Sequence, residues 1–307
     1  MDAPLNVPEH AQRLLLNLIT KSHEDYIDPL TSIDWSKGID KTRYPKRKDG
    51  CWLYGTEYWD RLSEEQKHEM AWKEIAREAS NFIWLEETIP LIFMTAVNQL
   101  GTAIPPAVRE YMMIFSREEL SHILMFRKYL KLADLELFKP SDGLHAFCVN
   151  DLPKMPPIMG TLCTLLVEHI AESGAVYLVS NDEVDPLTRE IFLRHHQEEA
   201  RHLSFGKWTT QAYLESASPE EKAKLKGVVE NLLGKLILKY TYNPEIANHV
   251  SFDFGIAADD AATAEKVRRS AVNDKHNDDR FHSLLLWLKK AGLLGENYNW
   301  RSATVEY

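Results

Sequence analysis

The sequence predicts an all-α protein built around a four-helix bundle. Apolar residues recur at helical spacing through most of the chain, and strand signals are nearly absent. A length of 307 residues is sufficient to bury a large core. We expect one domain over residues 1–307, with the bundle core at about 63–216, an N-terminal arm at 1–62 and additional helices at 217–307.

The N-terminal third is expected to contain a short helix, an arm and the first bundle helix. Apolar spacing predicts the short helix at residues 8–22. Residues 25–59 lose this spacing among Asp, Pro, Gly and Trp, which favours an ordered arm packed on the core. The first bundle helix is expected at about 63–100, because Ser63 and Gln66 have the spacing of a capping box.

Three further bundle helices are expected at about 105–133, 158–180 and 186–216. The segment between the first two of these is long and rich in proline. Such a crossover between helix pairs is one of the known bundle topologies. Beyond the bundle, apolar spacing predicts helices at about 218–240 and 261–294.

Composition restricts the partners and the compartment. The net charge is −10 and Lys and Arg are interspersed with acids, so nucleic acid is not an expected partner. Cys51, Cys148 and Cys163 are widely spaced and odd in number, which is typical of free thiols in a reducing compartment. The first residues, Met-Asp-Ala-Pro-Leu-Asn, lack the basic region typical of a signal peptide, and no apolar run reaches the ~18 residues of a membrane span. We therefore expect a cytoplasmic protein without a membrane partner.

The predicted helix at 186–216 contains the densest group of candidate metal ligands. At about 100° per residue, His195, Glu199 and His202 share one helix face. Apolar residues, among them Ile191 and Phe205, stand on either side of them. The face that should enter the core therefore holds two imidazoles and a carboxylate.

The other three bundle helices also place acids among apolar residues. The second has Glu119 and His122 in a Glu-x-x-His motif, the third has Glu168, and the first has the adjacent pair Glu86 and Glu87. Helical phase favours Glu86 by a small margin. One Glu from each of two helices plus Glu-x-x-His from each of the other two is the di-iron or di-manganese site of ferritin-like bundles. Such hard ligands suit iron or manganese, and two divalent cations would balance four inward glutamates.

Two other spacings of this kind have simpler explanations. Glu65 and His68 also form Glu-x-x-His, but they lie in the first turn of a helix among charged residues, where capping and solvation account for them. His276, Asp279 and His282 stand at i, i+3 and i+6, but their neighbours are polar. We expect a structural or solvated role for these three.

These motifs resemble those of the di-iron arylamine N-oxygenases, a family that converts p-aminobenzoate or the chloramphenicol amine precursor to the nitro compound. His195 is the specific feature, since ordinary ferritin-like sites need six protein ligands and this family adds a third histidine as a seventh. The resemblance spans about residues 60–210 and rests on Glu86, Glu119, His122, Glu168, His195, Glu199 and His202.

The resemblance implies a division of these ligands between two irons. Under it, Glu119 and Glu199 bridge the metals, Glu86 and His122 complete one iron, and Glu168, His195 and His202 complete the other. An added imidazole changes the coordination of one iron without adding negative charge. On the same helix as Glu168, Glu172 is expected beside the ligands, while His169 is expected to point about 100° away.

The implied activity is oxidation of an amine nitrogen of a small molecule by O2, with two Fe ions (or Mn) as cofactor and an external electron donor, in natural product biosynthesis. A di-iron carbon hydroxylase or desaturase, which would share every ligand except His195, is the first alternative. A ferritin-like iron-storage or iron-binding protein is the second, although the extra histidine and the long arms have no evident use there. The identity of the amine, the extent of oxidation and the oligomeric state, a homodimer included, stay open.

Overall fold

The computed structural model describes residues 9–140, 145–241 and 244–303, and it confirms the all-α class. Within these ranges there are helices and turns but no strand, apart from an isolated parallel bridge between Tyr44 and Val184. The α-helices are α1 (Glu9–Glu24), α2 (Glu57–Asp60), α3 (Glu64–Leu100), α4 (Pro106–Leu132), α6 (Pro157–Val179), α7 (Pro186–Ser216), α8 (Pro219–Thr241), α9 (Ala261–Arg268) and α10 (Ala271–Lys290). Single turns of 3-10 or π helix occur at Trp35–Lys37, Lys48–Gly50, Gly101–Ala103, Phe147–Asp151, Leu152–Lys154, Pro244–Asn248 and Trp300–Ser302.

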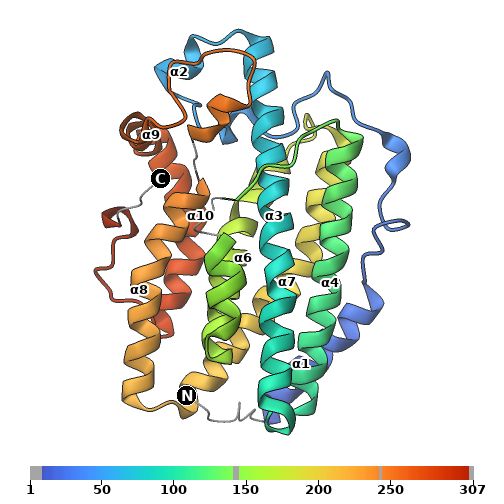
Figure 1. The fold of residues 1–307 in the computed structure, drawn as a ribbon, viewed down its shortest axis with the longest axis vertical. Helices are drawn as coiled ribbons and strands as arrows, with labels where there is room; N and C mark the ends of the chain where they lie inside the picture. The colour runs from blue at the N-terminus through green and yellow to red at the C-terminus, as the bar shows by residue number, and fades with distance from the viewer. Residues whose placement is uncertain (1–8, 141–144, 242–243, 304–307) are drawn as a thin grey trace.

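Helices α3, α4, α6 and α7 form the four-helix bundle (Figure 1). α3 packs along α4 and α6 along α7, and contacts of α3 with α6 and of α4 with α7 close the bundle. The chain passes from α3 to α4 through a short turn, whereas α4 and α6 are joined by a long connection, of which residues 133–140 and 145–156 are described, as the proline-rich segment predicts. α1 covers α4 and α7, while α8 and α10 pack on α6.

Local signals start the bundle helices where the sequence predicts. The Ser63 side chain accepts a hydrogen bond from the N–H of Gln66, and the Gln66 side chain accepts one from the N–H of Ser63, which completes the capping box of α3. α7 starts with Pro186 after Asp185, whose carboxylate accepts from the N–H of Thr188. These caps fix the start of two helices that bear candidate ligands.

The single helix predicted for 261–294 is wrong, because the structure divides it. α9 ends at Arg268 and α10 begins at Ala271, with Ser270 between them in an extended conformation. The Ser270 side chain accepts from the N–H of Asn273, so it caps a new helix and does not continue the old one. α10 ends at Lys290, and Gly292 follows at a φ of 73°, a left-handed conformation that favours glycine.

Two aromatic clusters enclose the middle of the bundle. Phe82 of α3 stacks on Phe126 of α4 at 5.1 Å between ring centroids, and Phe192 of α7 joins them. On the other side of the candidate ligands, the rings of Phe93 in α3 and Phe115 in α4 meet at 4.8 Å between centroids. Phe205 of α7 packs against that second pair. The candidate ligands lie between the two clusters in α3, α4 and α7, so the aromatic rings separate them from the bundle ends.

α6 is the most apolar bundle helix. By length and composition α6 could span a membrane, although the sequence has no uninterrupted apolar run of that length. In the fold, however, 78% of the relevant window is buried. Its apolar surface is thus used for packing, as in the core helix of a bundle. Cys163 of this helix and Cys51 of the arm are buried free thiols, whereas the Cys148 side chain lies outside the described part.

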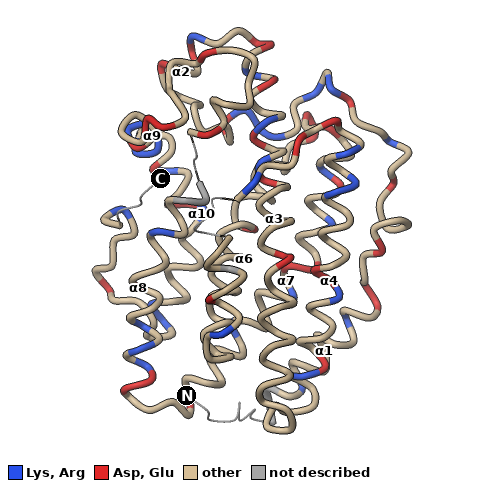
Figure 2. The backbone as a smooth tube through the Cα atoms, in the orientation of Figure 1, with Lys and Arg blue, Asp and Glu red and all other residues tan. Residues whose placement is uncertain are grey.

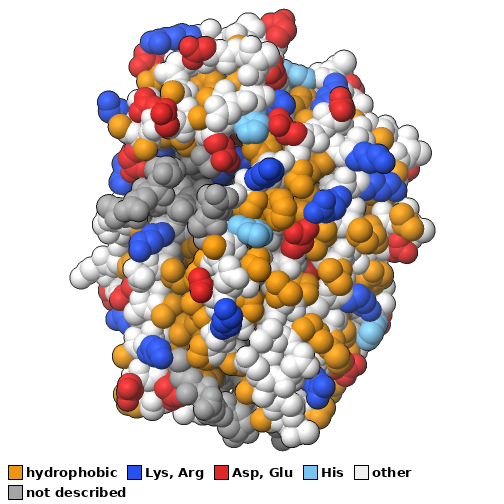
Figure 3. All heavy atoms as spheres, in the orientation of Figure 1, with side chains coloured by type: hydrophobic (Ala, Val, Ile, Leu, Met, Phe, Trp, Pro, Cys, Tyr) orange, Lys and Arg blue, Asp and Glu red, His pale blue; other side chains and the backbone are white. Residues whose placement is uncertain are grey.

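Charge is distributed without a basic stripe on the face in view. Figure 3 shows Lys and Arg interspersed with acids and apolar side chains there. Figure 2 shows acidic residues halfway along α3 and α4, and Glu86 and Glu119 in these stretches are buried. Carboxylates buried in a helical bundle need a compensating positive charge or hydrogen bonds.

Candidate metal centre

The structure brings all seven predicted ligands together in the middle of the bundle. Their side chains come from α3, α4, α6 and α7, and each residue is at most 7% exposed. They form two groups in which one ligand atom per residue lies within 4.8 Å of the others: Glu86, His122, His195 and Glu199 in the first, and Glu119, Glu168, Glu199 and His202 in the second.

Glu199 belongs to both groups, so its carboxylate lies where a bridge between two metals would be. Glu119 also faces both groups. Its Oε1 is 2.9 Å from Nδ1 of His202, and its Oε2 is 3.8 Å from Nδ1 of His122. These two carboxylates have the positions that the resemblance gives to bridging ligands.

The division of the remaining ligands differs from the one implied by the resemblance. His195 was expected with Glu168 and His202, but it lies in the group of Glu86 and His122. Its Nε2 is 2.9 Å from Glu86 Oε1. Its ring is 4.5 Å from that of His122 and packs edge-on against Phe82 at 4.6 Å. The reason is axial position: His195 precedes Glu199 by one turn, so it lies toward the Phe82 end of the bundle, whereas His202 follows it by almost a turn.

Each of the three histidines points one ring nitrogen to the centre and the other to a buried carboxylate. The second nitrogen of His122, Nε2, is 2.7 Å from Glu198 Oε2. For His202 the corresponding distance is 2.8 Å, to Glu118 Oε2. Since these carboxylates accept a hydrogen bond, the N–H occupies the outer nitrogen and the inner lone pair is available to a metal.

His195 has the same arrangement with its nitrogens exchanged. Its Nδ1 is 2.9 Å from Glu172 Oε1, while Nε2 faces the centre. Glu172 Oε2 is 2.7 Å from Nδ1 of the half-buried His196. Glu172 therefore lies beside the ligands, as expected from its position one turn beyond Glu168. His196, which lies about 100° round α7 from His195, shares this carboxylate.

Glu118 and Glu198 were not identified from the sequence as functional residues. A signal was present, because each directly precedes a predicted ligand, so that α4 and α7 both read Glu-Glu-x-x-His. Helical phase places the first Glu about 100° from the second, so spacing along one helix does not place it beside the ligands. Both side chains are nevertheless fully buried in the assembled bundle.

The electrostatics of the centre are those of a site that needs cations. Burial raises the pKa of Glu86 to about 7, although His195 and His122 act in the opposite direction. Burial, followed by the nearby Glu199 and Glu119, raises the pKa of Glu168 well above its usual value. For Glu199 burial also acts upward, but His202 and His195 outweigh it and hold its pKa well below the usual value.

A direct test of fit is whether the inner atoms have partners within the protein. Seven buried side-chain atoms of the centre have no hydrogen-bond partner: Glu86 Oε2, both oxygens of Glu119, His122 Nδ1, both oxygens of Glu168, and Glu199 Oε2. Buried polar atoms are rarely left in this state. Carboxylate oxygens and imidazole nitrogens are also the donors that iron and manganese prefer. The residues therefore fit a pair of such ions.

Glu87 and His169, which were not predicted to be ligands, lie outside the centre. Glu87 forms an ion pair with Arg127 at 2.7 Å and its side chain is 36% exposed, whereas Glu86 is buried. His169 is buried, but its Nδ1 faces Ser173 Oγ at 3.0 Å, and burial lowers its pKa to about 4.

The residues of the two other motifs with ligand-like spacing also lie outside the centre. Glu65 is solvated and its carboxylate accepts from Ser63 Oγ, while His68 Nε2 lies 2.9 Å from the carbonyl oxygen of Arg43. His276 is half-buried and lines a pocket with Asp279.

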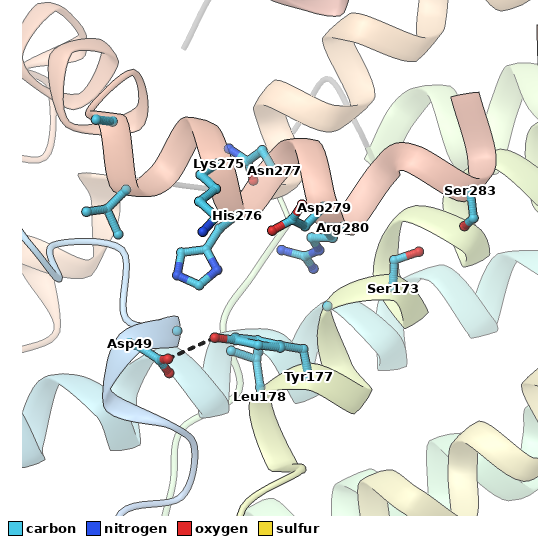
Figure 4. A pocket seen from close by; sticks show the side chains of 14 residues that line it. Asp49, Ser173, Tyr177, Leu178, Lys275, His276, Asn277, Asp279, Arg280 and Ser283 are labelled. Atoms are coloured by element: carbon cyan, nitrogen blue, oxygen red, sulfur yellow. Dashed lines mark hydrogen bonds between the residues drawn. The ribbon is translucent and has the colours of Figure 1, made fainter. Parts of the chain in front are cut away.

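That pocket has a volume of about 790 Å³ and lies between α10, α6 and the arm (Figure 4). Its lining includes cationic Lys275 and Arg280 as well as acidic Asp49 and Asp279. Tyr177 of α6 donates a hydrogen bond to Asp49 Oδ2 at 2.8 Å. The volume is in the range of about 300–1,000 Å³ typical of small-molecule sites.

Arg280 connects this pocket with the part of α6 that bears ligands. Its Nη2 is 3.4 Å from the carbonyl oxygen of Ile170, which lies between Glu168 and Glu172. Gly174 gives the guanidinium this place, because a Cβ at position 174 would be 1.7 Å from the same nitrogen and would displace the Arg280 side chain. The guanidinium also lies 3.9 Å from Glu78 of α3, two turns before Glu86. Arg280, which lines the pocket, thus contacts both helices that supply the single glutamates.

A four-helix bundle with two Glu-x-x-His helices and two single glutamates around paired metal positions defines the class of ferritin-like dinuclear carboxylate proteins. Within this class, a family model described as p-aminobenzoate N-oxygenase AurF matches residues 6–282. The chain belongs to this family, whose members are non-haem di-iron N-oxygenases, and it is therefore an oxidoreductase. No curated protein matches the chain.

Proposed function

We propose that the seven clustered side chains hold two iron ions and that the enzyme oxidises the amine nitrogen of a small, acidic aromatic molecule. The observation that carries the proposal is the convergence of seven inward-facing ligand atoms in two groups sharing Glu199. In this proposal Glu86, His122 and His195 would hold one ion, Glu168 and His202 would hold the other, and Glu119 and Glu199 would contribute to both. Manganese has similar ligand preferences, and the choice of iron is supported by the family.

The bound ions would supply activation of O2 with electrons from an external donor. The protein's own contribution is to position and enclose the site. The phenylalanine clusters on either side of the ligands restrict the access of water. Glu118, Glu172 and Glu198 fix the ring orientations of the three histidines through one hydrogen bond each.

We propose that the substrate occupies the pocket between α10 and α6. p-Aminobenzoate, which the family description names, has a carboxylate opposite the amine. Lys275 and Arg280 offer cations to such a group, and Arg280 reaches the ligand-bearing stretch of α6. The acidic residues of the same pocket can accept hydrogen bonds from the N–H groups of an arylamine, which is uncharged near pH 7.

A cytoplasmic location and a homodimer also stay proposals. The buried free thiols Cys51 and Cys163 support a reducing compartment. Exposed apolar side chains on α3 and α4, among them Leu91 and Leu124, support contact with a second copy.

The experiment that tests the function combines iron analysis with product analysis. Iron-loaded protein is supplied with a chemical reductant, O2 and p-aminobenzoate, and the products are separated by mass. Hydroxylamino, nitroso or nitro products support the proposal. Products hydroxylated on carbon would favour a hydroxylase, and iron uptake without any product from a panel of arylamines would favour iron storage. Glu119→Ala, which removes an inward carboxylate, serves as the inactive control.

A further inference from the structure

Arg201 lies where two buried carboxylates of different helices meet. Its Nη2 is 3.3 Å from Glu118 Oε1 of α4 and 3.1 Å from Glu198 Oε1 of α7. The other oxygen of each carboxylate accepts the hydrogen bond of a histidine that faces the centre. Glu118 Oε2 accepts from His202 at 2.8 Å, and Glu198 Oε2 accepts from His122 at 2.7 Å. The Arg201 guanidinium therefore contacts both of the carboxylates that support His202 and His122.

The arrangement is reciprocal between the helices. In each Glu-Glu-x-x-His motif the first Glu supports the histidine of the other helix, and the second Glu faces the centre. His122 stands in the first metal group and His202 in the second. A displacement of Arg201 would consequently release supports in both groups at once.

No other described cation reaches both carboxylates. Arg117 is 3.6 Å from Glu118 Oε1, but its side chain is 40% exposed and it is not paired with Glu198. Arg201, by contrast, is only 9% exposed. Its Nε donates to Ser22 Oγ of α1 at 3.0 Å, which fixes the direction of the guanidinium. Two buried carboxylates without this partner would repel one another and lose a charge-assisted contact each.

We propose that Arg201 is a positioning residue that couples the two metal positions by holding Glu118 and Glu198 against the outer nitrogens of His202 and His122. The inference rests on the proposed role of these histidines as metal ligands. It assigns to Arg201 no contact with metal or substrate. Its effect is on ring orientation, and thus on the affinity for both ions.

The test is an anaerobic titration of the metal-free, full-length chain with Co²⁺, followed by the visible ligand-field absorption of the bound ion. Wild type is expected to bind two Co²⁺ per chain. Arg201→Met keeps the aliphatic stem and loses the guanidinium, so affinity should fall about 10- to 100-fold at both positions, and the absorption bands should shift. Arg201→Lys, which keeps a charge, should recover part of the affinity. Arg194→Met, on the same helix but bonded to Gln197 at the surface, should match wild type.

A double-mutant cycle separates positioning from a general loss of stability. If Arg201 acts through the carboxylates, Glu118→Gln should weaken binding at the His202 position in wild type but have little further effect once Arg201→Met is present. Additive effects would overturn the proposal, and so would unchanged Co²⁺ affinity in both Arg201 variants. Wild type that binds no Co²⁺ would instead overturn the metal centre itself. If Arg201→Met does not fold, as judged by circular dichroism, the cycle is run with Arg201→Lys, for which a smaller loss of affinity and a partial reduction of the Glu118→Gln effect are expected.

Discussion

Glu172 Oε1 accepts a hydrogen bond from Nδ1 of His195 at 2.9 Å. His195 is the histidine that distinguishes the chain from a six-ligand bundle, and this contact supports it with a buried carboxylate. His195 thus has the same support as His122 and His202. A residue that merely filled space in the core would not need a fixed ring orientation. The contact favours a role as ligand.

His195→Ala is expected to retain two irons, since six of the proposed ligands remain, but to lose amine oxidation by at least about 10-fold. The reason is that the first metal group loses one of its two imidazoles. Iron per chain and product formation are measured on the same preparation.

The control for this variant is Gln197→Ala, because Gln197 is exposed on the same helix. His196→Ala is not an inert control, since His196 shares Glu172 with His195, and an intermediate loss is expected. Full activity of His195→Ala would show that the third histidine is dispensable.

The pair Glu86 and Glu87 offers a comparison of adjacent residues. Glu86→Ala should lower iron content, because Glu86 is buried in the first metal group, whereas Glu87→Ala should lose an exposed ion pair worth about 0–1 kcal/mol and keep both irons. Iron analysis and thermal unfolding measure the two effects. Full iron in Glu86→Ala beside depleted Glu87→Ala would reverse the assignment.

Metal removal should make stability dependent on pH in a defined direction. The pKa of Glu86 is raised from 4.5 to about 7 in the folded chain, and the pKa values of His122, His195 and His202 also lie well above their usual value. Between about pH 5 and 8 the folded metal-free state therefore binds more protons than the unfolded state, so its stability falls as pH rises. The loaded protein should lack this dependence and be more stable at pH 8.

Thermal unfolding of both forms across this range checks the prediction. Identical melting temperatures with and without metal at every pH would indicate that the carboxylates are solvated and not compensated by cations.

Arg280→Met should weaken the use of an acidic arylamine without affecting the metals. Arg280 lines the pocket and its side chain is 17% exposed, so the variant removes a cation accessible to a substrate carboxylate. KM for p-aminobenzoate should rise about 10-fold or more, while KM for an arylamine without an acidic group should change little. Equal effects on both substrates would argue against an acid-binding role.

Much of the fold could be predicted because local signals and periodicity agree. The capping box at Ser63 and the proline after Asp185 fix helix starts that the structure reproduces. The division of the last helix at Ser270 was missed, because a serine within an apolar pattern is compatible with helix and becomes a cap only through its conformation. One domain over the whole chain stays a prediction.

The candidate ligands could be named from the sequence, but not their grouping. Spacing along one helix shows which side chains share a face, so His195, Glu199 and His202 could be placed together. Which of them meets Glu86 or Glu168 depends on how far each helix is displaced along its axis, and this is a property of the packed bundle. For the same reason the sequence could not show the roles of Glu118 and Glu198, because each bonds to a histidine of the opposite helix.

The central claim is that seven side chains hold a pair of irons, and diffraction from crystals of the iron-loaded protein at the iron absorption edge tests it most directly. The account predicts two anomalous peaks about 3.5–4 Å apart. One should lie among Glu86, His122 and His195, the other should lie among Glu119, Glu168 and His202, and Glu199 should lie between the peaks. Absence of both peaks, or peaks outside this cluster, would contradict it.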